Sequence, residues 1–157
     1  MGHVPARWVG ARFLHEHDGQ SLVEVALLLP MLVFLILAGG DLARAYAQQL
    51  AVQNGARAGA EAVAIDFTPT AAEAQARAID EMGRTPGLNT SDPSLVVTVS
   101  FLKSDGITTC TTDPTPADPC WATVRVQLTF RTVTPWPLIP NTANFDRTTS
   151  MRTIKAP

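Results

Sequence analysis

The sequence predicts an α+β protein, in which one long N-terminal helix leads into a small antiparallel β-sheet of three or four strands. Three observations predict this class. Residues 22–40 form an apolar run with a single charge, residues 41–65 continue it with Ala-rich sequence, and from residue 95 the apolar residues alternate. A change of the apolar period from helical spacing to two indicates a helix followed by strands.

The first 19 residues read as a leader that lies outside the fold. They contain Arg7 and Arg12 but also Glu16 and Asp18. Basic residues before an apolar run keep the N-terminus in the cytoplasm. We therefore expect residues 1–19 to face the cytoplasm and to be a targeting segment.

The long helix is expected over residues 20–65, with residues 22–40 spanning the membrane. That run is close to the roughly 20 residues needed to cross a bilayer, and it includes one acid, Glu24. A carboxylate at the edge of hydrocarbon is costly and therefore a functional candidate. Pro30 removes the bond to the Ala26 carbonyl and should bend the helix. The rest of the helix must project from the membrane.

A stripe of small residues follows the membrane segment. Its members recur every four residues and share a face of the helix: Ala47, Ala51, Gly55 and Gly59. Small residues at this spacing allow helix backbones to approach closely. We interpret the stripe as a helix-packing face; the alternative is a generic Ala-rich helix that tolerates two glycines.

A short second helix is expected from Thr70 to about Gly83. Thr70 and Glu73 form a capping-box pattern, and Ala72, Ala76 and Ile79 mark its apolar face. The segment from residue 83 to 87 ends it, because it contains two glycines and a proline.

Three strands are expected in the head, residues 66–157. In residues 95–101 the odd-numbered positions are apolar, and in residues 122–130 the even-numbered positions are apolar. Residues 145–154 alternate poorly, and we expect them to form an edge strand. The apolar stretch Pro135–Pro140 is expected to pack over the sheet or a helix.

The two cysteines, Cys110 and Cys120, lie in a Pro-rich loop between the first two strands. A disulfide there would contribute roughly 2–3 kcal/mol in the chain-entropy model and would place the head in an oxidising compartment. Two unpaired thiols are the alternative. Two cysteines are too few for an unaided zinc site, and all three histidines lie in the leader.

No catalytic pattern is present in the sequence. There is no nucleophile elbow, no phosphate-binding Gly loop and no His-based metal spacing. The formal net charge of −2 and the scattered basic residues argue against a nucleic-acid surface. We expect no enzyme activity, no cofactor and no metal.

One stretch of about 45 residues, which begins at Gly19, combines the following features: Gly19 with Glu24 five residues later, Val23, Ala26-Leu27, Leu29-Pro30, Asp41, Arg44, Tyr46, and Asn54-Gly-Ala-Arg57-Ala-Gly59-Ala60. With these features the stretch resembles the TadE-like pseudopilins of the tight-adherence (Flp) pilus system, related to type IV prepilins. Asp18 departs from the family pattern, in which a basic residue usually precedes the glycine. The remaining 90 or so residues match only in general layout.

The resemblance implies a pseudopilin or minor pilin with a pilin-like fold. A membrane prepilin peptidase would cut after Gly19 and make Gln20 the N-terminal residue, and Glu24 would neutralise the new amine on a neighbouring subunit. The implied partners are that peptidase, other pilin-like subunits, the pilus assembly platform and the lipid bilayer. The implied location is the bacterial cytoplasmic membrane with the head outside, and possible export to a pilus or the cell surface after assembly.

Two other interpretations remain open from the sequence. An ordinary signal peptidase could cut after Gly40, because Ala38 and Gly40 supply small residues at the required positions, and so release a secreted binding domain. Alternatively, the chain is never cut and remains a single-pass anchor with a ligand-binding head. The N-terminal residue of the mature protein, Gln20, Asp41 or Met1, separates the three.

Overall fold

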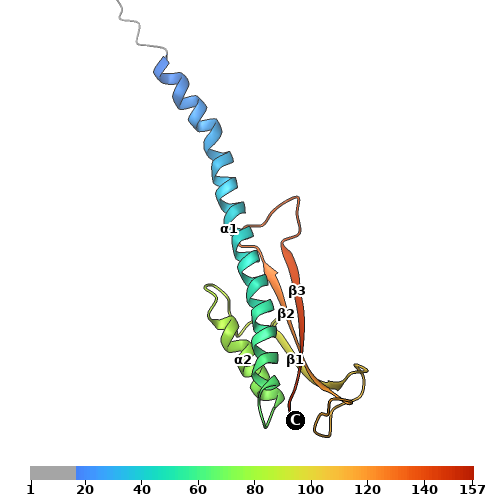
Figure 1. Ribbon diagram of the computed structural model, residues 1–157. Coiled ribbons are helices and arrows are strands. Elements are labelled where there is room, and N and C mark those ends of the chain that lie inside the picture. Colours follow the sequence, from blue (N-terminus) through green and yellow to red (C-terminus); the bar gives the residue numbers. More distant parts are fainter. Residues whose placement is uncertain (1–16) are drawn as a thin grey trace, which may run out of the picture. The chain divides into compact units, whose positions relative to one another are not determined.

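The computed structural model describes residues 17–157, with side chains from Gln20 onward. Five elements follow in order (Figure 1): α1 (His17–Ala64), α2 (Ala71–Gly83), β1 (Val96–Lys103), β2 (Cys120–Arg131) and β3 (Thr142–Arg152). The chain divides after Ala38 into two compact units, and the second of them comprises residues 39–157. The predicted α+β class is confirmed, whereas residues 1–16 of the predicted leader lie outside the described part.

Helix α1 begins at His17, three residues before the predicted start, and ends at Ala64. It continues through Pro30 without interruption. In the first unit, every large apolar side chain of the helix from Leu22 to Leu37 is exposed. In the second unit, its other half supplies part of the core of the head.

The sheet is three-stranded and antiparallel, in the order β1-β2-β3. Strand β2 pairs Ala122 with Phe101 of β1 and with Met151 of β3. All three strands lie where the alternation predicts them, and β3 occupies an edge, as expected. Strand β3 begins at Thr142, earlier than the predicted residue 145, because Thr-rich sequence hides its alternation.

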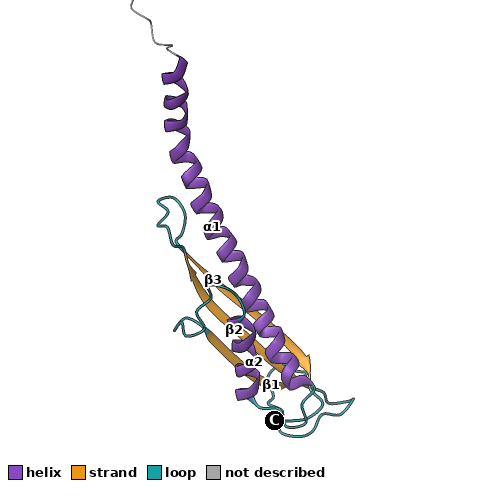
Figure 2. Cartoon of the chain, turned by 90° about the vertical axis from the view of Figure 1, so that its left-hand side faces the viewer, coloured by secondary structure: helices purple, strands orange, loops and turns teal. Residues whose placement is uncertain are grey.

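Both helices cover the same face of the sheet (Figure 2). Every second side chain of β2 points into this core, and Ala122, Val124 and Val126 are fully buried there. Opposite them, α1 buries four small or branched side chains: Val52, Ala56, Ala60 and Val63. The opposite face of the sheet is polar. It carries cross-strand pairs such as the one between the Thr123 and Ser150 hydroxyls, 2.8 Å apart.

The predicted apolar face of α2 is wrong. Ala74, Ala78 and Met82 are the buried residues of α2, whereas Ala72 and Ala76 are exposed and Ile79 is 38% exposed. Alanine lies at helical spacing on both faces of this segment, so the pattern cannot distinguish them. Methionine at position 82 fills the space above Gly55, and this contact decides which face turns inward.

Candidate processing site, membrane segment and head contacts

The predicted processing site lies in the first turn of α1. Gly19 is the third residue of the helix. Gln20 and Glu24 follow it and lie one helical turn apart. The Gln20 side-chain amide donates to Glu24 Oε1 over 3.2 Å, and both side chains are exposed. The Glu24 carboxylate therefore has a neutral partner in the uncut chain, at the i,i+4 spacing that brings helix side chains together.

An apolar surface begins at Leu22 and continues on both sides of Glu24. Thirteen large apolar side chains between residues 22 and 37 are each 44–73% exposed: Leu22, Val23, Val25, Leu27, Leu28, Leu29, Met31, Leu32, Val33, Phe34, Leu35, Ile36 and Leu37. Among the described residues, this helix is long and apolar enough to cross a membrane, with a mean hydropathy of 2.6 over 18 residues. A helix that is apolar all round belongs in a bilayer or a large core, which makes this segment a candidate membrane anchor.

Asp41, the first charged residue after this run, is a carboxylate of α1 that is buried against the head. Its Oδ1 accepts the Val133 backbone N–H at 3.0 Å, and its Oδ2 accepts the Thr134 N–H at 3.2 Å and Trp136 Nε1–H at 3.1 Å. Arg44 lies 3.3 Å from Oδ1. These donors, foremost the Val133 N–H, hold the pKa of Asp41 below its ordinary value.

The three donors come from the loop that joins β2 to β3, so Asp41 fastens residues 132–141 to α1. Figure 1 shows this loop returning to α1 between the two strands. From the sequence, Asp41 was recognised as part of a family signature, and its contact with this loop was not predicted. The available signals were an isolated acid directly after an uncharged run and a tryptophan inside a Pro-rich loop.

We expected Pro135–Pro140 to pack over the sheet or a helix. This is wrong for Leu138 and Ile139, which form the apolar tip of the loop. Leu138 is 94% exposed and Ile139 is 58% exposed. The loop is held through hydrogen bonds to a carboxylate at its neck, and its apolar side chains are left outside the core.

The two glycines of the small-residue stripe on α1 are covered by α2 of the same chain. Ala47 is half-buried, Ala51 is buried, and both glycines are buried. A Cβ atom at Gly55 would lie 2.6 Å from Met82 Cγ, and one at Gly59 would lie 2.7 Å from the Ala74 carbonyl oxygen. Glycine is therefore required at both positions by the close approach of α2.

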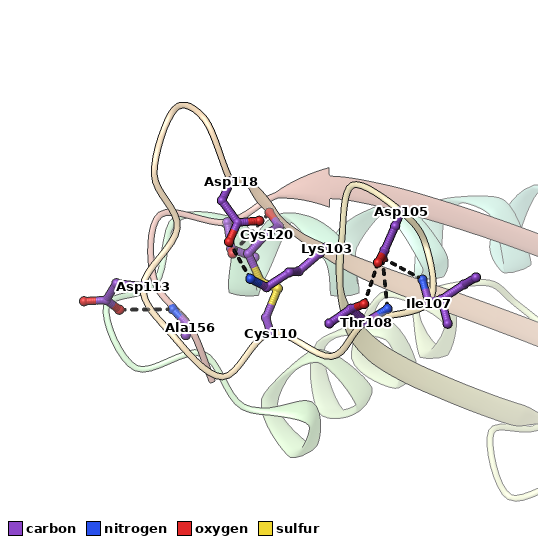
Figure 3. The surroundings of a disulfide bond; sticks show 10 residues. Lys103, Asp105, Ile107, Thr108, Cys110, Asp113, Asp118, Cys120 and Ala156 are labelled. Atoms are coloured by element: carbon purple, nitrogen blue, oxygen red, sulfur yellow. Dashed lines mark hydrogen bonds and ion pairs between the residues drawn. A yellow bond between two sulfur atoms is a disulfide. The ribbon is translucent and has the colours of Figure 1, made fainter.

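Cys110 and Cys120 form the predicted disulfide, with their Cα atoms 6.0 Å apart (Figure 3). Both cysteines are buried. Lys103 pairs with Asp118 beside the bridge. Asp105 accepts the Thr108 hydroxyl and the Ile107 and Thr108 N–H groups, which lower its pKa to about 2. These contacts order the long β1–β2 loop at one end of the sheet.

An open hollow of about 540 Å³ lies between α1 and α2 in the head. Its charged lining comes from Arg57, Glu61, Arg77 and Glu81. Within the described part of the chain, no cluster of three His, Cys, Asp or Glu residues could hold a metal ion. The head thus offers packing and polar surface, and the features with a clear chemical role lie along α1.

Residues 19–61 match the sequence model of a family described as TadE-like protein. The match begins at the glycine of the predicted processing site and includes Asp41 and both buried glycines, and it confirms the resemblance drawn from the sequence. No curated protein and no solved structure matches the chain.

Proposed function

Because residues 19–61 carry the TadE-like signature, we propose that this protein is a membrane-anchored pseudopilin or minor pilin of a tight-adherence pilus or a related secretion apparatus. One observation carries the proposal. The matched segment combines Gly19 and Glu24 with an apolar helix surface that is entirely exposed and then enters a folded head. The TadE-like family is a structural one, and we assign the protein no catalytic role.

In this proposal, residues 1–19 are a cytoplasmic leader, residues 22–40 cross the membrane, and residues 66–157 form the extracytoplasmic head. A prepilin peptidase hydrolyses the peptide bond between Gly19 and Gln20. The hydroxyl group of water adds to the Gly19 carbonyl carbon, which becomes the C-terminal carboxylate of the leader. The proton goes to the Gln20 nitrogen, which becomes a charged N-terminal amine.

Glu24 is placed to neutralise that amine. Gln20 and Glu24 already approach within 3.2 Å through the Gln20 side chain. The amine can be met by Glu24 of the same chain or by Glu24 of a neighbouring subunit. Among packed helices an unpaired charge is costly, and removal of one partner typically costs about 3–5 kcal/mol. Pairing between subunits would therefore favour assembly.

The bilayer serves as the reservoir for the subunit. The exposed side chains of residues 22–37 contact lipid until the helix meets other pilin-like subunits at the assembly platform. Lipid contacts are then exchanged for helix–helix contacts, which depend on close packing because lipid is already apolar.

The test compares Gly19→Leu and Glu24→Gln with the unchanged protein in cells that make the complete apparatus. Intact mass should show an N-terminus at Gln20 for the unchanged protein and for Glu24→Gln, and an uncut chain for Gly19→Leu. Glu24→Gln should be cut but largely absent from the assembled structure.

Other outcomes would contradict specific parts of the proposal. A mature protein that starts at Asp41 indicates secretion by an ordinary signal peptide, and one that starts at Met1 indicates an uncut anchor. Normal assembly of Glu24→Gln would show that Glu24 does not pair in the assembly.

A further inference from the structure

We infer that the loop between β2 and β3, residues 132–141, is a second membrane contact, which lies in the bilayer interface beside the end of the membrane helix. The inference rests on the proposed membrane anchor. It adds that the head itself binds lipid, through a surface that the family match at residues 19–61 does not include.

The position of the loop follows from its attachment to Asp41. Three hydrogen bonds of 3.0–3.2 Å join that carboxylate to the neck of the loop. Asp41 directly follows the uncharged run Val25–Gly40. It lies three residues beyond Ala38, which is at most about 11 Å even in an extended chain. A bilayer that surrounds the apolar run therefore reaches the neck of the loop.

The composition of the loop suits this position. Residues 132–141 contain no ionisable side chain. Three apolar side chains point away from the core, with Val133 74%, Leu138 94% and Ile139 58% exposed. Trp136 combines a large apolar ring with one N–H group, and tryptophan is enriched where a membrane meets water.

The backbone of the loop is also suited to an environment with little water. Pro135, Pro137 and Pro140 have no N–H group to satisfy. Asn141 closes the neck: its Oδ1 accepts the Trp136 N–H at 2.6 Å, and its Nδ2 donates to the Trp136 carbonyl oxygen at 3.2 Å. Burial of a peptide group without a partner is costly, so these features reduce the cost of leaving water.

Lipid is the occupant that these observations favour over a protein partner. The loop is fastened at the boundary of the apolar run, and lipid surrounds that run on every side before assembly. Because the loop is bonded to Asp41, it stays at the end of the head that adjoins the apolar run. Interfacial segments bury their apolar side chains roughly 5–10 Å into the headgroup region, which a loop tip such as Leu138-Ile139 can reach.

The experiment uses the full chain in phosphatidylcholine vesicles whose acyl chains carry bromine, a contact quencher of tryptophan emission. Trp8→Phe with Trp121→Phe leaves Trp136 as the reporter. Trp8→Phe with Trp136→Phe leaves Trp121, the matched control. Ten residues of β2 separate Trp121 from Arg131, a distance of about 33 Å, and place the control at the far end of the strand from the loop.

We expect the emission of the Trp136 reporter to fall at least about twofold in brominated vesicles, since the ring should lie within the interfacial layer. The Trp121 reporter should show no change. Leu138→Ser with Ile139→Ser, both at exposed positions, should reduce the quenching of Trp136 and leave the fold intact by circular dichroism.

Flotation of the same vesicles tests the membrane anchor separately from the lipid contact of residues 132–141. A chain that floats while Trp136 remains unquenched keeps its anchor and overturns the inference. Equal quenching of Trp136 and Trp121 indicates general adsorption of the head and also overturns it. Shielding of Trp136 from both bromine and aqueous iodide indicates that protein rather than lipid covers the ring, again against the inference. A chain that does not float overturns the membrane anchor itself.

Discussion

At the scale of single residues, Asp41 determines more of the head than any motif suggests. Its carboxylate accepts a backbone N–H from a residue 92 positions later in the chain. Arg44, one turn further along α1, pairs with it and lies 5.7 Å from the centre of the Phe130 ring. Two neighbouring side chains of α1 thus fix both the end of β2 and the loop that follows it.

The contact made by Asp41 should depend on pH. The donated hydrogen bonds, led by that of Val133, lower the pKa from its ordinary value of 3.8. The stabilising contribution is therefore fully present above pH 3.8 and is lost as the pH falls through the lowered pKa. We expect Trp136 emission to change with a midpoint below 3.8.

The matched variant for this prediction is Asp41→Asn, which keeps the shape of the side chain and removes the titrating group. Its emission should be free of that transition and should resemble the acid form at neutral pH. A transition with the same midpoint in the variant would assign the pH dependence to another group.

Gly59 provides a second test at this scale. A methyl group at this position would lie 2.7 Å from the Ala74 carbonyl oxygen and 3.3 Å from Val124 Cγ1, so α2 or β2 must shift. Although alanine is the better helix former, overpacking typically costs about 1–3 kcal/mol. We expect Gly59→Ala to lower the free energy of unfolding of the head by an amount within this range, measured by denaturant titration in detergent.

Gly83→Ala is the control for Gly59→Ala, because its nearest neighbour would be Thr90 Cγ2 at 3.6 Å, an ordinary contact. It should leave the stability of the head nearly unchanged. An equal loss for both variants would mean that glycine is needed for something other than the approach of α2.

At the scale of elements, the N-terminal cap of α2 shows how a local pattern and its surroundings act together. The Thr70 hydroxyl oxygen accepts the Glu73 N–H at 3.2 Å, as a capping box requires. A side-chain hydrogen bond with Asp66, in the turn before the helix, raises the pKa of Glu73, because two neighbouring carboxyl groups favour a shared proton. The preceding turn therefore affects Glu73 as well as the cap does.

The disulfide between Cys110 and Cys120 should stabilise the head through the β1–β2 loop. Its sequence separation is 10, and closure of a loop of this size contributes about 2–3 kcal/mol in the chain-entropy model. Cys110→Ala with Cys120→Ala should lower the free energy of unfolding by that amount, with Trp121 emission as the probe beside the bridge.

Two measurements check this assignment. Protein isolated from cells should resist thiol alkylation until reductant is added. The reduced native protein should then unfold at nearly the same denaturant concentration as the double variant. Labelling of both cysteines without reductant would contradict the bridge.

At the scale of the whole molecule, the two units differ in how much of their apolar surface is buried. The first unit exposes every large apolar side chain between residues 22 and 37, whereas the second encloses a core built by α1, α2 and the sheet. A surface as apolar as the first requires lipid or partner helices. The second unit is stabilised by its own contacts and by a disulfide, a bond that persists in oxidising compartments.

The orientation of the chain can be tested directly. Arg7 and Arg12 precede the apolar run, and basic residues remain on the cytoplasmic side. An alkaline phosphatase fusion after Pro157 should be active, and a fluorescent protein that folds only in the cytoplasm should be dark at the same position. The opposite pair of results would reverse the topology and place the disulfide in a reducing compartment.

The sequence by itself determined those features that depend on local periodicity and chemistry. The apolar run predicts the helix from residue 20 because its length and uncharged character leave few alternatives. Alternation in residues 122–130 predicts β2 and its buried face. The family signature at residues 19–61 was readable for the same reason, since its residues lie on one continuous helix.

Only the tertiary structure decided which surfaces meet. Alanine occupies both faces of α2, and the inward face was chosen by the fit of Met82 against Gly55. The contact of Asp41 with Val133 and Trp136 joins segments more than 90 residues apart. No local pattern encodes such a pairing, because an acid after an apolar run has no preferred donor until the sheet brings one close.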